Sequence, residues 1–352
     1  MSEFKHNSEE NYIEIIQRLV KAIVVLLAII VILLVFIVWG GPSPKKEFPI
    51  VKSETKTEAI EKPKADVWIA PDTSSIKNEK NAAQIIYGRE LIANTSLYLG
   101  PQGKVAHNSN GMNCQNCHLD AGTRPFGNNY SGVASTYPKF RERSGTMETI
   151  YKRVNDCFER SLNGKTLDTL GNEMQAIVAY IKWLGKDVPK GEKPKGAGLT
   201  ELKYLDRPAD PEKGKIVYMA KCKTCHTENG EGKLNEGGLT YQYPPLWGEH
   251  SYNDGAGLFR LSRFAGYVKS NMPQNTTYDA PQLSDEEAWD VAAFVNSQPR
   301  PKKDLSKDWP KISGKPVDHP FGPYADKFSE QQHKFGPFGP IAEAKKKDKN
   351  KL

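Results

Sequence analysis

The pentapeptides "CQNCH" at residues 114–118 and "CKTCH" at residues 222–226 decide the fold of this chain of 352 residues. Each places two cysteines about one helical turn apart, with a histidine directly after the second. Two thiols at this spacing can each form a thioether to a haem vinyl group, while the histidine binds the iron. A tetrahedral zinc site accommodates the adjacent histidine poorly, and a redox-active dithiol is the other alternative. Because the motif occurs twice, we expect two covalently bound c-type haems. The predicted thioether cysteines are Cys114, Cys117, Cys222 and Cys225, and the predicted proximal iron ligands are His118 and His226.

Apolar helical patterns flank both motifs in the same order, which indicates an internal repeat. "AAQIIYGRELIANTSLYLG" precedes the first motif and "PEKGKIVYMAK" precedes the second. "NEMQAIVAYIKWLG" (172–185) and "SDEEAWDVAAFVNS" (284–297) follow them, and the latter begins with a capping-box pattern, Ser284 and Glu287. Helix, haem motif, loops and closing helix in this order resemble a class I cytochrome c that occurs twice.

The N-terminal region contains the stretch "AIVVLLAIIVILLVFIVW", Ala22 to Trp39, which has no charged or polar side chain. As a helix it would span ~27 Å, close to the thickness of the hydrocarbon core of a bilayer. A cleaved signal peptide has a shorter apolar region that ends in small residues. The stretch therefore predicts an uncleaved anchor. Since haem c is attached on the extracytoplasmic side, we expect an inner (cytoplasmic) membrane protein with periplasmic haem domains.

These patterns predict a mainly α fold, with two class I cytochrome c-like domains in tandem, an N-terminal transmembrane helix and an extended C-terminal strap. The predicted segments are a cytoplasmic N-terminus (1–21), the anchor (22–41), a tether (42–80), the first haem domain (81–190), a linker (191–209), the second haem domain (210–300) and the C-terminal strap with a lysine-rich tail (301–352). The net charge is only +7, and basic and aromatic residues do not interleave in one stripe. Nucleic acid is therefore not an expected partner.

Each iron also needs a distal ligand or an open position. In the second domain, Met272 precedes a proline in the polar loop "VKSNMPQN", and methionine opposite histidine is a common cytochrome c ligand pair. Lys269 is an alternative donor if it loses its proton. In the first domain, the candidates are Met147, Cys157 and Met174.

Cys157 is the one cysteine outside the two haem motifs. It lies in "TMETIYKRVNDCFERS" (146–161), which predicts a helix with Arg153, Cys157 and Ser161 on one stripe. Nearby cations favour a thiolate, which is both the better ligand and the better nucleophile. The alternative is an inert buried cysteine. Clustered arginines indicate an anionic substrate, because guanidinium groups offer paired donors to oxyanions.

The sequence at this point resembles the thiosulfate dehydrogenase family of dihaem cytochromes c, over about residues 80–300. The resemblance rests on "GMNCQNCHLDAG", "FRERSGTMETIYKRVNDCFERSLNG", "EMQAIVAYIKWL", "CKTCH" and the order of the two domains. Matched position by position, it implies that Cys157 is the distal ligand of the first haem. Substrate-binding roles follow for Arg143, Arg153 and Ser161, and Gln175 is expected to face the same pocket. His226 and Met272 would bind the second iron.

The resemblance implies oxidative coupling of two thiosulfate ions to tetrathionate, with electrons leaving through the second haem; the same site could run in reverse as a tetrathionate reductase. The expected electron partner is a cytochrome c, an oxidase or a quinol-linked membrane complex. One alternative is a tethered dihaem electron carrier, with Met147 or Met174 on the first iron. The other is a relative of the dihaem subunit of the periplasmic sulfur-oxidising system.

Overall fold

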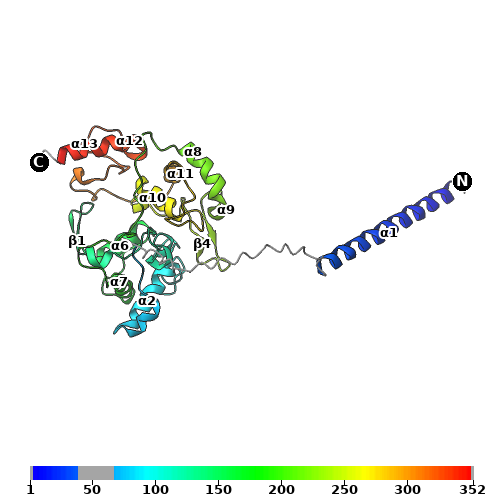
Figure 1. Cartoon of the computed structure of the whole chain (residues 1–352), viewed down its shortest axis with the longest axis horizontal. Helices are drawn as coiled ribbons and strands as arrows, with labels where there is room; N and C mark the ends of the chain where they lie inside the picture. Colours follow the sequence, from blue (N-terminus) through cyan, green and yellow to red (C-terminus); the bar gives the residue numbers. More distant parts are fainter. Residues whose placement is uncertain (1–2, 39–66, 350–352) are drawn as a thin grey trace, which may run out of the picture. The chain divides into compact units, whose positions relative to one another are not determined.

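The computed structural model describes residues 3–38 and 67–349 of the chain, which fall into two separate units, Met1–Glu61 and Lys62–Leu352 (Figure 1). In the first unit, helix α1 covers Glu3–Val38. Its stretch Ile16–Val35 has a mean hydropathy of 3.0, so by length and composition it could cross a membrane. Residues 22–38 of the predicted anchor therefore belong to one longer helix, and its last three residues, 39–41, are outside the described residues. Residues 42–66 of the predicted tether are outside the described residues.

The first cytochrome domain is built from short helices around the first haem motif. Its elements are η1 (Thr73–Asn78), α2 (Ala82–Ala93), α3 (Thr95–Leu99), η2 (Cys114–Asn116), α4 (Leu119–Gly122), α5 (Val133–Thr136), β1 (Lys139–Arg141), β2 (Thr146–Glu148), α6 (Ile150–Arg160) and α7 (Asn172–Leu184). Strands β1 and β2 form an antiparallel hairpin that places residues 142–145 at its turn. Residues 67–80, predicted as tether, pack against this domain: Ile76 is buried in its core, and the Trp68 amide donates to the Lys195 carbonyl.

The second cytochrome domain repeats the plan with its own core. Its elements are α8 (Pro211–Lys221), α9 (Lys223–His226), β3 (Lys233–Leu234), β4 (Tyr241–Tyr243), η3 (Gly257–Phe259), α10 (Leu261–Asn271) and α11 (Asp285–Ser297). Ser284 caps α11, and its hydroxyl and the Glu287 carboxylate form the capping box expected from the sequence.

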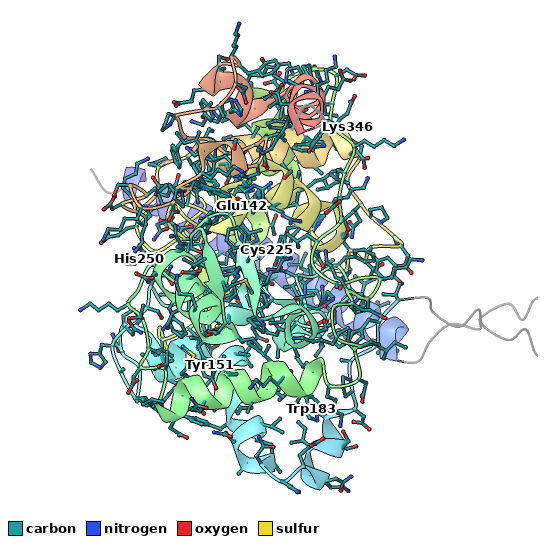
Figure 2. All side chains as sticks on the ribbon, turned by 90° about the vertical axis from the view of Figure 1, so that its left-hand side faces the viewer. Glu142, Tyr151, Trp183, Cys225, His250 and Lys346 are labelled. Carbon is teal, nitrogen blue, oxygen red and sulfur yellow. The ribbon has the colours of Figure 1, made fainter. Side chains whose placement is uncertain are left out.

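The C-terminal strap (residues 301–352) differs from the extended segment that we expected, because it contains η4 (Ile312–Gly314) and the helices α12 (Glu330–Phe335) and α13 (Gly339–Lys349). Apolar spacing explains the helices: Phe335, Phe338 and Ile341 are buried in the core of the second domain. Lys346 on α13 and Trp183 on α7 lie near opposite ends of this unit (Figure 2).

A second correction concerns residues 146–161, which the sequence analysis assigned to one helix. Residues 146–148 instead form strand β2, and helix α6 starts at Ile150, where the Thr149 side chain accepts a hydrogen bond from the Lys152 amide. Thr149 is a good N-cap residue. Thr146 and Thr149 are β-branched, which suits the extended segment that precedes the helix. The stripe of Arg153 and Cys157 stays within the helix.

The first and last helices of each cytochrome domain cross at a glycine. A Cβ atom on Gly88 of α2 would lie 1.9 Å from the Ala176 carbonyl oxygen of α7. A Cβ atom on Gly214 of α8 would lie equally close, 1.9 Å, to the Asp290 carbonyl oxygen of α11. Only glycine permits such a close approach of two backbones. The repeat therefore extends from the haem motif to the helix crossing that supports it.

Replacing Gly88 or Gly214 with alanine should lower the free energy of unfolding by about 1–3 kcal/mol, because the added methyl group overlaps a backbone oxygen. Thermal unfolding followed by circular dichroism measures the change. Gly237→Ala is the matched control, since a Cβ atom there meets no described atom within 4 Å. If Gly88→Ala and Gly214→Ala were both as stable as the wild type, this would contradict the close approach of the two helix backbones.

Candidate functional site

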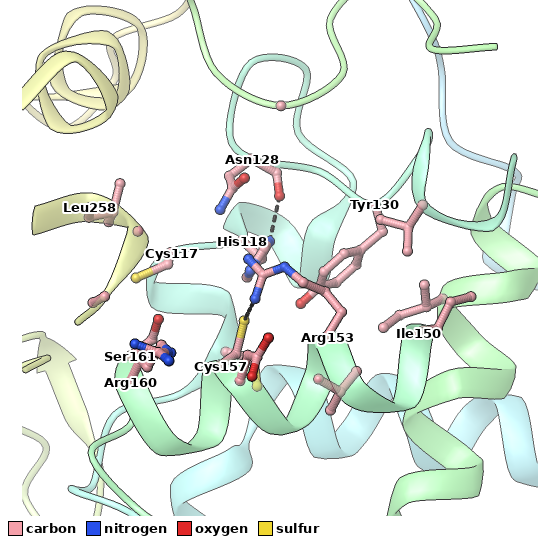
Figure 3. A pocket seen from close by; sticks show the side chains of 18 of the residues that line it. Cys117, His118, Asn128, Tyr130, Ile150, Arg153, Cys157, Arg160, Ser161 and Leu258 are labelled. Atoms are coloured by element: carbon pink, nitrogen blue, oxygen red, sulfur yellow. Dashed lines mark hydrogen bonds between the residues drawn. The ribbon is translucent and has the colours of Figure 1, made fainter. Parts of the chain in front are cut away.

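The first haem motif and helix α6 face a common cavity of about 390 Å³ (Figure 3). Cys114, Cys117 and His118 line it from one side, and Cys157 lines it from α6. Helix α6 lines the cavity with polar side chains such as Arg153 and with apolar ones, including the buried Phe158. This apolar burial stabilises a helix that carries many charged residues.

The two motif histidines are held in the same way. His118 Nδ1 lies 2.5 Å from the Asn128 carbonyl oxygen, and His226 Nδ1 lies 2.9 Å from the Pro244 carbonyl oxygen. Burial lowers the pKa of His118 to about 4, and burial also lowers the pKa of His226. A neutral imidazole that donates from Nδ1 to a carbonyl presents its Nε2 lone pair to a metal. Both histidines therefore fit the role of a haem iron ligand.

Of the candidates for the distal position in the first cavity, only Cys157 lines it. Met147 on β2 is 62% exposed, and Met174 on α7 is fully buried in the core of the first domain. Neither methionine is among the residues of the cavity.

Arg153 makes a direct contact with Cys157. Its Nη1 lies 2.9 Å from the Cys157 Sγ, one helical turn along α6 (Figure 3). The negative charge of a Cys157 thiolate raises the pKa of the buried Arg153, although burial alone would lower it. The guanidinium and the sulfur therefore form a direct polar contact inside the cavity.

Arg143 and Ser161 line the same cavity as Arg153. Arg143 lies in the turn of the β1–β2 hairpin and Ser161 follows the last residue of α6. Burial, followed by the charges of Arg160 and Arg153, lowers the pKa of Arg143 to about 10. Arg143 thus keeps its charge at neutral pH in a strongly positive environment.

Gln175 does not face this cavity, contrary to the expectation from the sequence. Its Nε2 donates to the Thr169 carbonyl oxygen at 2.7 Å, and its Oε1 accepts from the Tyr151 hydroxyl at 3.2 Å. The side chain instead ties the start of α7 to α6 and to the segment that precedes α7.

Two further arginines of the second domain reach the first cavity: Arg260, the N-cap residue of α10, and Arg263 in the first turn of α10. The sequence analysis missed them, because they lie about a hundred residues from Cys157 and belong to no local motif with it. Arg141 and Arg160 also line the cavity. Six guanidinium groups from two domains therefore line this cavity within the described part of the chain, together with the Cys157 sulfur and the carboxylates of Glu148 and Asp156.

The second cavity has a volume of about 980 Å³ and is lined by Cys222, Cys225, His226 and Met272. Met272 directly follows α10. Lys269 is not among the lining residues, because its Nζ donates to the Leu283 carbonyl oxygen at 2.7 Å and lies 2.6 Å from the Asp285 carboxylate. Five residues line both cavities, namely Met112, Asn113, Cys117, Tyr252 and Leu258. The two cavities thus share a wall.

Comparison with known proteins identifies the two domains. Residues 104–189 match the SoxA/TsdA cytochrome c domain model, and residues 211–299 match the cytochrome c model. The thiosulfate dehydrogenase of Psychrobacter arcticus is 38% identical over 243 residues, which cover 68% of this chain and 71% of that protein. The thiosulfate dehydrogenase of Allochromatium vinosum is 36% identical, over 68% of this chain and 87% of that protein.

The chain belongs to the thiosulfate dehydrogenase family. A solved structure of the family, the thiosulfate dehydrogenase TsdBA of Marichromatium purpuratum in its as-isolated form, superposes with a TM-score of 0.62 at 31% identity. The match covers 68% of this chain and 51% of the solved chain, so this chain spans about half the length of that protein.

Family membership and the geometry of both cavities agree on two covalently bound c-type haems. Each cavity brings together two cysteines and a histidine with a free Nε2, and each lies inside a cytochrome c domain. The tandem cytochrome c fold that the sequence predicted is therefore confirmed.

Proposed function

We propose that this chain oxidises two thiosulfate ions to tetrathionate at the first cavity. A sulfur–sulfur bond forms between the two sulfane sulfurs, and two electrons leave the pair. The observation that carries the proposal is the Arg153–Cys157 contact in a cavity that the first haem motif also lines, in a chain of the thiosulfate dehydrogenase family. A pure electron carrier has no use for this cluster of cations.

The principal obstacle to the reaction is charge. Two dianions within bonding distance repel each other through four unit-charge pairings, each of ~1–4 kcal/mol at 4 Å in water-like to surface-like surroundings. Arg143 and Arg153 are proposed to bind the sulfonate oxygens and offset this repulsion, with Ser161 as a neutral donor. Arginine suits the task because its fork of N–H donors matches tetrahedral oxyanions.

Cys157 is proposed as the distal ligand of the first haem iron and as the sulfur atom that contacts the bound substrate. The contact from Arg153 fixes its Sγ, and Cys157 lines the cavity. When bound, the haems would accept the two electrons one at a time, and a thiolate ligand would lower the potential of the first iron.

His226 and Met272 are proposed as the ligands of the second iron, because both line the second cavity. Lys269 is the weaker candidate. Its ammonium group is held by the Leu283 carbonyl and the Asp285 carboxylate, so an exchange of ligand would first have to break both contacts. Electrons would cross the shared wall to the second haem and leave from there.

We further infer that α1 anchors the chain in the inner membrane, with both haem domains on the periplasmic side. The support is the apolar stretch Ile16–Val35 together with the extracytoplasmic attachment of c-type haem. The proposed electron partner is then a cytochrome c, an oxidase or a quinol-linked complex. Tetrathionate reduction would use the same residues, since a catalyst serves both directions of a reaction.

Replacing Cys157 with alanine should reduce thiosulfate-dependent reduction of ferricyanide by roughly 100-fold or more, because the variant loses its reactive sulfur. Electron paramagnetic resonance of the oxidised protein should show a low-spin thiolate-ligated ferric signal in the wild type alone. Met147→Ala, which alters an exposed methionine, is the control and should match the wild type. Wild-type activity in Cys157→Ala would show that the cysteine is not catalytic. Absence of thiosulfate oxidation in the wild type, with histidine–methionine signals at both irons, would instead indicate an electron carrier.

Replacing Met272 with alanine should lower the reduction potential of the second haem, because a methionine ligand raises it. Redox titration followed by visible spectroscopy measures the potential. Lys269→Ala should leave both spectrum and potential at their wild-type values. A changed spectrum in Lys269→Ala but not in Met272→Ala would assign the lysine as ligand.

Protein purified from the membrane fraction should retain the apolar stretch of α1. Intact-mass spectrometry tests this directly, because removal of a signal peptide would lower the measured mass of the protein by the mass of the removed N-terminal segment. A mature N-terminus beyond Trp39 would show that the segment is a signal sequence and would overturn the anchor.

A further inference from the structure

Two aspartates of the C-terminal strap each hold an arginine that lines the first cavity. The Asp308 carboxylate accepts hydrogen bonds from Arg160 Nη1 and Nη2, both at 2.9 Å. The Asp318 carboxylate accepts from Arg260 Nε at 2.9 Å and from Arg260 Nη2 at 2.6 Å. Arg160 belongs to the first domain and Arg260 to the second. The strap therefore fixes one cavity arginine from each domain.

The contact with Asp308 leaves some N–H donors of the Arg160 guanidinium without an acceptor. A guanidinium has five N–H donors, and the paired contact with Asp308 employs one on each Nη atom. Arg160 Nε is buried and has no hydrogen-bond partner among the described residues. Buried donors normally find a partner, and one left without costs stability. Because Arg160 lines the cavity, an oxyanion bound there could accept these free N–H groups.

The strap also fixes the turn that carries Arg143. The Trp309 amide donates to the Arg143 carbonyl oxygen at 2.7 Å, and the Arg143 guanidinium lies 5.9 Å from the centroid of the Trp309 ring. Pro310 packs so closely on Gly145 that a Cβ atom there would lie 2.6 Å from the proline Cγ. Residues 308–310 thus contact both Arg143 and Arg160.

The charge around Arg160 explains why a fixed partner is needed. Arg143 and Arg160 repel each other, which contributes to the lowered pKa of Arg143, whereas Asp308 acts in the opposite direction. Without Asp308, the Arg160 side chain would move away from the other guanidinium groups towards water. The carboxylate therefore keeps a cation in place where its neighbours would expel it.

Resting on the function proposed above, we propose that Arg160 is a further thiosulfate-binding residue and that Asp308 of the strap is its positioning residue. Asp308 does not touch the substrate. It orients the guanidinium so that the free Nε–H edge faces a bound sulfonate group. The strap is then part of the anion-binding site, and not only a covering of the second domain.

Steady-state kinetics with ferricyanide as acceptor test the pair through Arg160→Gln, Asp308→Asn and the double variant. Arg160→Gln should raise the KM for thiosulfate at least about tenfold, the usual scale for a lost hydrogen bond to a charged group, with kcat changed much less. Asp308→Asn should raise KM about three- to tenfold in the wild-type background and have almost no effect in Arg160→Gln, because a positioning residue acts through its partner.

Asp304→Asn is the matched control on the same strap. The Asp304 carboxylate is exposed and accepts a hydrogen bond from the nearby Ser306 amide, and the variant should keep the wild-type KM. Arg160→Lys provides a second variant if Asp308→Asn fails to fold. It keeps the charge but loses the planar fork, so its KM should approach that of Arg160→Gln.

Several results would overturn the proposal while leaving the proposed function intact. One is that the wild type is active and that Arg160→Gln and Arg160→Lys have the same KM for thiosulfate as the wild type. Another is that Asp308→Asn raises KM equally in the wild-type and the Arg160→Gln backgrounds. A wild-type KM together with a shifted reduction potential in Arg160→Gln would assign Arg160 to the haem and also overturn it. Absence of thiosulfate oxidation in the wild type would contradict the proposed function itself.

Discussion

The concentration of positive charge in the first cavity is the constraint on which the rest of the site depends. Six guanidinium groups line it, and a buried cation is costly unless a partner compensates for it. Compensating groups lie beside five of the six: the Cys157 sulfur beside Arg153, Asp308 on Arg160 and Asp318 on Arg260. Glu148 lies 4.0 Å from Arg141, and Glu201 lies 4.0 Å from Arg263. Although burial alone would raise the pKa of Asp318, Arg260 and Ser262 lower it, so the carboxylate stays charged. Among the described residues, Arg143 forms no ion pair and donates only to the Gly255 carbonyl, so its charge is available to an anionic substrate.

The position of the cavity between two cytochrome domains explains how so many cations come together. Arg143 and Arg153 come from the first domain, whereas Arg260 and Arg263 come from the start of α10 in the second. The strap contacts both domains. Its last two helices pack into the core of the second domain, and Asp308 binds Arg160 at the end of α6 in the first. A single cytochrome c domain could not build this site.

The local parts of this structure could be predicted from the sequence, and the long-range parts could not. The haem motifs and the apolar helical patterns that flank them repeat at short spacings, so the tandem fold was accessible, and the stripe of Arg153 and Cys157 follows from the spacing within one helix. Residues 146–148 form a strand because the Thr149 cap delays the helix, a local choice that apolar spacing did not reveal. Gln175 faces Tyr151 because the start of α7 packs on α6. The contact of Asp308 with Arg160 joins residues 148 positions apart, and no motif connects them.

The shared wall between the cavities connects the two halves of the proposed function. The coupling of thiosulfate releases two electrons, whereas each haem would take up one electron at a time. Cys117, a thioether cysteine of the first motif, lines both cavities together with Tyr252. Arg300 lies 4.3 Å from the centroid of the Tyr252 ring and donates to the Leu246 and Val295 carbonyls, which fixes the ring from behind. The arginines of the first cavity are not among the residues of this wall. On the function proposed above, the anion would bind among the arginines, while the wall would hold the second haem close enough to the first to accept electrons from it.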